Sequence, residues 1–204
     1  TSVVAPFAEL AHHYHRALGR DALERAVRFS VRAAEHAREL LGYEEACAHY
    51  ERALAAQSTL GAPVRERLPL LLDFAEVQAL AGNGDGLRAT CLEAAPLARE
   101  AGDPRALARA ALGYGRIPAL QADDPTHVGL LEEALAALPD GDSPLRARLH
   151  ARLVLATYYG APPEERDRHA CEAVAMARRL GDAATEAIAL RSQYHALAGT
   201  PDPS

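Results

Sequence analysis

Apolar side chains recur along the chain at the spacing of amphipathic helices, with polar positions between them. The spacing predicts a short helix over residues 6–18, a long helix over residues 21–41 and its antiparallel partner over residues 43–56. Asp21 is the expected cap of the long helix, and Gly42 is expected to break it. The positions expected to face inward on the long helix are Leu23, Val27, Val31, Ala34 and Leu41.

The pattern of helices and turns then repeats about every forty residues. Gly61, Gly102, Gly141 and Gly181 are separated by 41, 39 and 40 positions, and the last three are each followed by Asp. Glycine tolerates the left-handed backbone that ends a helix, and Asp accepts hydrogen bonds from the N–H groups that open the next helix. An alanine ladder runs in phase with these turns, at Ala53, Ala94, Ala134 and Ala173. Repeats of this length indicate stacked helical pairs.

These boundaries predict an all-α protein, an α-solenoid of antiparallel helix pairs forming a single repeat domain over residues 1–204. The last helix has no partner in the chain, so we expect a further segment or another copy to cover its apolar face. Because the chain starts without Met and stops within an unfinished repeat, we expect it to be a fragment of a larger protein. The pairs are expected at about 21–58, 63–101, 104–138 and 143–180, with a partial pair at 182–198.

The composition narrows the chemistry that the chain can perform. Hydrophobic residues make up 49% and aromatic residues 5%, which favours helix over strand. All 22 basic residues are Arg, because the sequence contains no Lys. A Walker-A phosphate loop and a Schiff-base enzyme both need a Lys amine, so both are excluded for this chain.

The net charge and the cysteine content indicate which partners and which cellular compartment to expect. The net charge of −6 argues against a general attraction to nucleic acid or to an anionic membrane. No apolar run approaches the roughly 20 residues that span a bilayer, and no secretory signal is recognisable. Cys47, Cys91 and Cys171 are odd in number and each falls in the second helix of a predicted pair. We therefore expect buried, reduced thiols in a cytoplasmic protein.

One segment carries a family resemblance. Residues 42–54 look like the second helix of a tetratricopeptide repeat, with Ala46, Tyr50 and Ala53 on the face that nests against the first helix. The resemblance implies a right-handed superhelix. It also implies a close-packed position on each first helix, which falls at Ala34, Ala75, Gly115, Val154 and Tyr194.

Repeats of forty residues resemble the helical region of large MalT-like or LuxR-type ATP-binding bacterial regulators. The similarity is carried by residues 9–14, 130–149 and 173–182. It implies a non-catalytic sensor or protein-interaction arm that binds an inducer or a partner protein, flanked in the parent by ATPase and DNA-binding modules. The alternative is a tetratricopeptide adaptor that captures peptides or oligomerises, and a homodimer is one expected assembly.

No residue pattern indicates a catalytic, metal or cofactor site. His12 and His15 have a spacing that could hold a metal, but no further ligand completes the sphere nearby, so packing is the favoured interpretation. The glycines of residues 82–86 could suggest a phosphate-binding loop, but no strand precedes them and no Lys is present. They are therefore predicted to form a turn between helices. The acidic pairs at 123–124 and 140–142 lack the spacing of a calcium loop and are expected to cap helices.

The remaining candidate is the concave face that the repeat register implies for the first helices. Arg side chains suit carboxylate or phosphate groups, and Tyr offers apolar area with a polar tip. A solvated helix face with ordinary surface arginines is the alternative. The candidate ligand- or partner-binding residues are Arg109, Arg116, Arg148, Tyr159 and Arg191.

Overall fold

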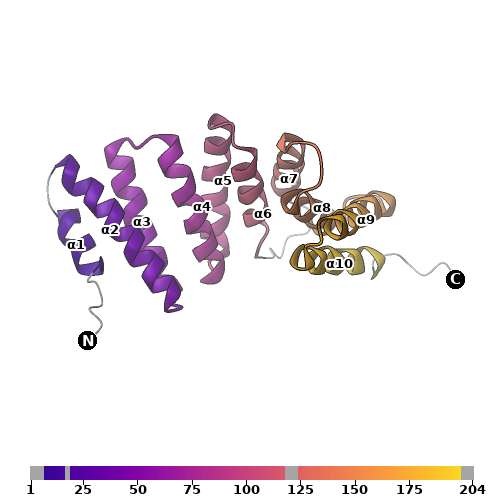
Figure 1. The fold of residues 1–204 in the computed structure, drawn as a ribbon, viewed down its shortest axis with the longest axis horizontal. Helices are drawn as coiled ribbons and strands as arrows, with labels where there is room; N and C mark the ends of the chain where they lie inside the picture. The colour runs from indigo at the N-terminus through magenta and orange to yellow at the C-terminus, as the bar shows by residue number, and fades with distance from the viewer. Residues whose placement is uncertain (1–6, 17–18, 118–123, 199–204) are drawn as a thin grey trace. The chain divides into compact units, whose positions relative to one another are not determined.

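A computed structural model describes residues 7–16, 19–117 and 124–198, and this part of the chain contains ten α-helices and no strand. Within each of the two parts of the chain described below, successive helices pack against each other as antiparallel neighbours, which confirms the all-α prediction (Figure 1). The chain divides into two compact units at the boundary between Ala101 and Gly102. No described helix has both the length and the apolar character needed to cross a membrane.

The first unit contains α1 (Phe7–Arg16), α2 (Arg20–Glu39), α3 (Tyr43–Leu60), α4 (Val64–Leu80) and α5 (Gly84–Glu100). Each helix packs against the next one. Tyr50 lies at the centre of its core, 6.1 Å from the ring of Phe74 between ring centroids. Ala46 and Ala53 are fully buried beside Tyr50, and Ala34 on α2 is equally buried. The expected nesting of a small–aromatic–small face against small first-helix residues is thus confirmed here.

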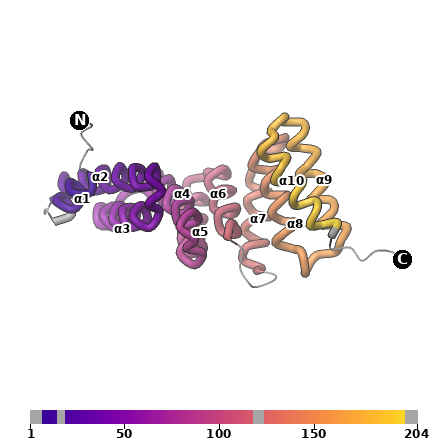
Figure 2. The backbone as a smooth tube through the Cα atoms, turned by 90° about the horizontal axis from the view of Figure 1, so that it is seen from below, coloured from indigo at the N-terminus to yellow at the C-terminus, as the bar shows by residue number. Residues whose placement is uncertain are grey.

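The second unit contains α6 (Pro104–Tyr114), α7 (Pro125–Ala137), α8 (Pro144–Ala156), α9 (Pro163–Leu180) and α10 (Ala183–Ala198). Helix α8 is its centre and contacts all four other helices. Helices α8, α9 and α10 run side by side in Figure 2. His150 meets His169 midway along α8 and α9, and Asp142 before α8 meets Arg179 late in α9, so these helices are antiparallel.

The glycine–aspartate turns behave as predicted at two of the three positions. Gly102 and Gly181 have φ of 61° and 65°, and Asp103 and Asp182 each accept hydrogen bonds from two backbone N–H groups of the following helix. Asp124 caps α7 in the same way.

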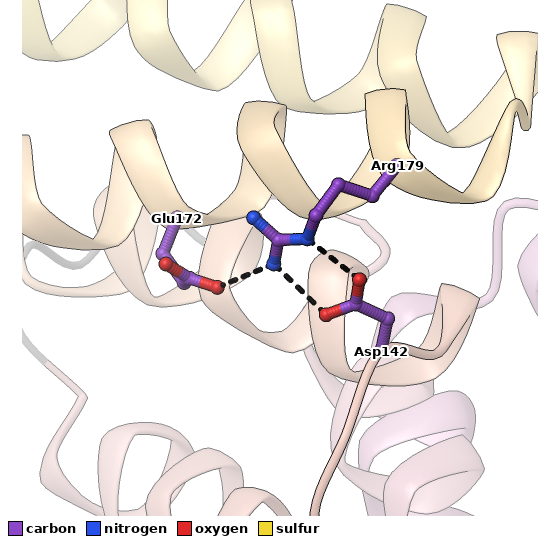
Figure 3. Close-up of polar contacts among 3 residues, drawn as sticks. All are labelled: Asp142, Glu172 and Arg179. Carbon is purple, nitrogen blue, oxygen red and sulfur yellow. Dashed lines mark hydrogen bonds and ion pairs between the residues drawn. The ribbon is translucent and has the colours of Figure 1, made fainter.

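The third turn corrects the prediction for Asp142. Ser143 caps α8 through its hydroxyl, which accepts from the N–H of Arg146 at 3.2 Å. Asp142 instead receives two hydrogen bonds from Arg179 on α9, 2.6 Å from Nε and 2.8 Å from Nη2 (Figure 3). Arg179 also reaches Glu172 at 3.1 Å. The carboxylate turns away from the helix start because a fork-shaped guanidinium offers two charge-assisted bonds.

Three other local predictions are wrong. Asp21 lies inside the first turn of α2, because the helix begins one residue earlier and Gly19 is its N-cap. Leu41 does not face inward: it follows the end of α2 in a left-handed conformation with φ of 63°, and is 70% exposed. Its N–H bonds the carbonyl of Arg38, as glycine does in other turns. Cys47 and Cys91 are buried free thiols, but Cys171 on α9 is exposed, so the expectation of a buried thiol is wrong there.

Candidate functional site: an arginine cluster on the second unit

All five predicted binding residues belong to the second unit, and the structure gives them different surroundings. Arg109 lies on α6, Arg116 directly follows that helix, Tyr159 lies in the turn after α8, and Arg191 lies on α10; all four are exposed. Arg148 on α8 is half-buried, and its Nε donates to Oγ1 of Thr185 on α10 at 3.4 Å.

Arg152, which the sequence analysis did not single out, is the centre of the site. This residue lies one turn after Arg148 on α8 and is half-buried. Its Nη1 donates to the carbonyl oxygen of Gly115 at 2.6 Å, which ties α8 to the end of α6. Arg116 immediately follows Gly115, so it lies next to the carbonyl that holds Arg152.

The packing of α8 and α10 brings Arg191 to the same place. Arg148 bonds Thr185 near the start of the two helices, and Val154 packs with Ala196 near their ends, so the helices run parallel. Arg152 and Arg191 each lie between these two contacts. The pKa of Arg152 is lowered, first by burial and then by the positive charges of Arg191 and Arg116. The guanidinium group of Arg152 therefore lies within electrostatic reach of both Arg116 and Arg191, which come from two other helical segments.

No carboxylate balances these charges within the described residues. Arg116, Arg152 and Arg191 form no ion pair there, and the side chain of Arg152 uses a neutral carbonyl as its partner. Asp124 lies at the adjoining start of α7, but it already accepts hydrogen bonds from the Tyr114 hydroxyl at 2.8 Å and from two N–H groups of α7. The site is consequently a cluster of positive charge on an acidic chain.

The buried side chain of His127 lies beside the cluster. Its ring packs against Gly115 and lies 5.4 Å from the Tyr114 ring. Burial, and then the charge of Arg152, lower the pKa of His127 to about 4, so the imidazole is neutral near pH 7. Its Nε2 is buried without a hydrogen-bond partner, and the Ala111 backbone interacts with the ring and opposes the lowering of the pKa.

The structure thus brings together two of the five predicted residues, Arg116 and Arg191, with Arg148 one turn away from Arg152. Tyr159 is 75% exposed and packs edge-on against Tyr158, at 4.8 Å between ring centroids. That these residues bind a ligand stays a prediction. Arg152 was missed because its partner, the Gly115 carbonyl, lies 37 positions earlier in the chain and no local pattern marks the contact.

A second group of titratable side chains lies between α8 and α9. The Nδ1 atoms of His150 and His169 are 2.8 Å apart, so one ring donates to the other. Burial and the neighbouring imidazole lower the pKa of His150 to about 4. Burial also lowers the pKa of His169, with Arg168 contributing. In the described residues no three potential ligands are grouped suitably for a metal ion. The turn expected at residues 82–86 is shorter than predicted, because α5 already begins at Gly84; Asn83 caps this helix by accepting a hydrogen bond from the Gly86 N–H.

The fold defines the chain as an all-helical, repeat-like array of antiparallel helix pairs. No family model matches the sequence, and no curated protein matches it either. A solved structure described as "DHF58 filament" is 21% identical, with 95% of this chain and 92% of that chain covered. The TM-score is 0.19, so this match carries no argument about the chain.

Proposed function

We propose that this chain is a non-catalytic sensor and protein-interaction arm of a multidomain bacterial transcriptional regulator. In this proposal the helix pairs stack as a tetratricopeptide-like α-solenoid with a right-handed superhelix. The arm acts in the cytoplasm beside the ATPase and DNA-binding modules of the parent protein, binds no nucleic acid itself and uses no cofactor. An inducer or a partner protein binds the surface formed by α6, α8 and α10.

The observation that carries the proposal is the group of Arg116, Arg152 and Arg191 without an acidic partner in the described residues. Like charges repel, and partial burial adds a desolvation cost to Arg152. An arrangement of this kind is stabilised when an anionic group supplies the missing charge. A partly buried arginine with two like charges nearby and no acidic partner among the described residues is therefore the best candidate for a recognition site.

The position of the cluster suits a sensor. Its arginines come from the end of α6, the middle of α8 and the middle of α10, so they belong to three successive helix pairs. A ligand that bridges them binds best when the three segments hold one particular spacing. Binding therefore favours that one arrangement of the helices over the others. A change of this kind in the populated arrangement is how a helical repeat can pass a signal along the chain.

Native mass spectrometry of the purified chain tests this proposal. We expect a co-purified mass on the wild-type monomer that is lost from the double variant Arg116→Gln, Arg191→Gln. The matched control is Arg105→Gln, Arg168→Gln, which removes two exposed arginines of the same unit outside the cluster and should keep the bound mass. Retention of the mass by the cluster variant, or its loss from both variants, would reject the cluster as the binding surface.

A second candidate, an adaptor or oligomerisation module, is favoured by the outer side of α10. Leu190, Tyr194 and Leu197 follow the spacing of one helix face and are 40%, 69% and 61% exposed. A bare dimer in the same experiment, dispersed by Leu190→Gln together with Leu197→Gln, would favour this candidate. A bare monomer at all concentrations would reject both the dimer and the co-purified inducer.

A further inference from the structure

The guanidinium group of Arg152 is held in place by a contact within the protein. A long Arg side chain normally loses conformational freedom when it binds, and that loss weakens affinity. Here the 2.6 Å bond from Nη1 to the Gly115 carbonyl fixes the guanidinium, and burial between helices restricts its stem. The guanidinium has five N–H donors, and this bond occupies one of them.

The charge of the site defines how many negative charges its ligand should carry. A monocarboxylate would neutralise one of the three guanidinium groups and leave the other two in repulsion. A group with two or three charges on closely spaced oxygens matches the cluster better, because Arg forks bind carboxylate and phosphate oxygens in pairs.

The rest of the chain argues against a large polyanion. The net charge is −6, so an extended acidic polymer or a nucleic acid would meet repulsion outside the cluster. A compact ligand can use the local positive charge without crossing the acidic surroundings. Salt screens charges that are more than about 10 Å apart at 0.1 M ionic strength, so the local cluster dominates at short range.

We propose that Arg116, Arg152 and Arg191 form a binding site for a compact oxyanion with at least two negative charges, either a phosphate monoester or a polycarboxylate. The proposal rests on the sensor function above and names the chemistry of its ligand. Arg152 is the fixed anchor, and the exposed Arg116 and Arg191 close on the anion from the two sides. The anion replaces the repulsion among the three arginines with charge-assisted hydrogen bonds.

Isothermal titration of the 204-residue chain in a phosphate-free buffer tests the proposal, with glycerol 2-phosphate and citrate as probes and acetate as the monoanion. We expect binding of at least one of the two multivalent probes, about tenfold or more tighter than acetate at matched ionic strength. The probe that binds identifies the source of the charge, phosphoryl or carboxylate. Equal affinity for acetate would overturn the requirement for multiple charges.

Three variants locate the site. Arg116→Gln and Arg191→Gln change exposed side chains, so they should fold normally and each weaken binding by about threefold to tenfold. Arg152→Met should abolish binding; because it removes both a half-buried charge and the bond to the Gly115 carbonyl, its melting temperature is measured beside it, and the two exposed variants decide where the site lies. The control Arg105→Gln should bind as the wild type does. Unchanged binding in Arg116→Gln and Arg191→Gln would overturn the proposal.

The two experiments together distinguish failure of the oxyanion assignment from failure of the proposed sensor function. If native mass spectrometry finds an uncharged or singly charged ligand that the cluster variant loses, the sensor function stands and the oxyanion assignment fails. If neither multivalent probe binds and the cluster variant keeps its co-purified mass, both proposals fail.

Discussion

Gly115 ends α6 at a point where the second unit has no room for a side chain. Its φ of −95° and ψ of 14° are accessible to alanine, so the backbone does not require glycine. A Cβ at this position would overlap Cε1 and Nε2 of the His127 ring. The ring is buried and held by its hydrogen bond to the Ala111 backbone and by contact with Tyr114.

These contacts set the expected cost of Gly115→Ala. In open space, glycine to alanine at a permitted backbone angle stabilises a protein by about 0.4–1 kcal/mol. Here the added methyl overpacks the core, which typically costs about 1–3 kcal/mol. Displacing His127 would also weaken its hydrogen bond, worth about 0.5–1.5 kcal/mol. The net expectation is a destabilisation of about 1–3 kcal/mol, opposite in sign to the open-space value.

Urea denaturation followed by circular dichroism measures this effect. Gly129→Ala on α7 is the matched control, because a Cβ there meets nothing within 4 Å. That control should stabilise the same unit by about 0.5–1 kcal/mol. In a His127→Ala background the cost of Gly115→Ala should disappear, which gives a coupling of about 1 kcal/mol or more. An equal cost in both backgrounds would refute the steric explanation.

Two further predictions concern backbone strain and pH. In urea denaturation, Leu41→Gly should be more stable than Leu41→Ala by about 1 kcal/mol. Both substitutions remove the exposed side chain, but only glycine relieves the strain of the left-handed backbone. An alanine variant that is equally stable or more stable would contradict this prediction. Burial holds the pKa of both His127 and His150 at about 4, below the unfolded value of about 6.5. The folded chain therefore binds fewer protons, and stability that is present above about pH 6.5 should be lost as the pH falls towards 4, by about 1–2 kcal/mol per histidine between pH 7 and 5. His150→Gln should reduce this slope in urea titrations at the two pH values, and an unchanged slope would argue against the buried pair.

The pattern of small residues and turns was enough to predict the helices. The spacing of the glycine–aspartate turns and the proline at Pro104 gave the boundaries of the pairs within a few residues, because capping is a local property. The burial of Ala46, Tyr50 and Ala53 also followed from helical spacing. Each of these features depends on neighbours within one or two turns of the same segment.

The errors arose where a side chain had two competing partners or where the backbone changed direction. Asp142 could cap α8 or bind Arg179, which lies 37 positions later in the chain, and only the packing of α9 decides between them. Leu41 continued the apolar stripe of α2 in the sequence, but the helix ends before it and the chain turns. Arg152 was missed for a similar reason, since its role depends on Gly115, again 37 positions away.

The recurring separation of 37 positions shows how a repeat array can add a specific site without disturbing its fold. Gly115 and Arg152, Arg148 and Thr185, and Asp142 and Arg179 are each separated by this number of residues. The apolar side chains of the helices form the core. A polar contact between successive helix pairs must therefore come from the remaining, polar positions. Arg152 uses such a position to reach a neutral carbonyl, and its charge stays available because no acidic residue occupies the corresponding place in the described chain. Packing therefore fixes where the arginines lie, while the absence of a matching carboxylate makes their location a candidate for recognition.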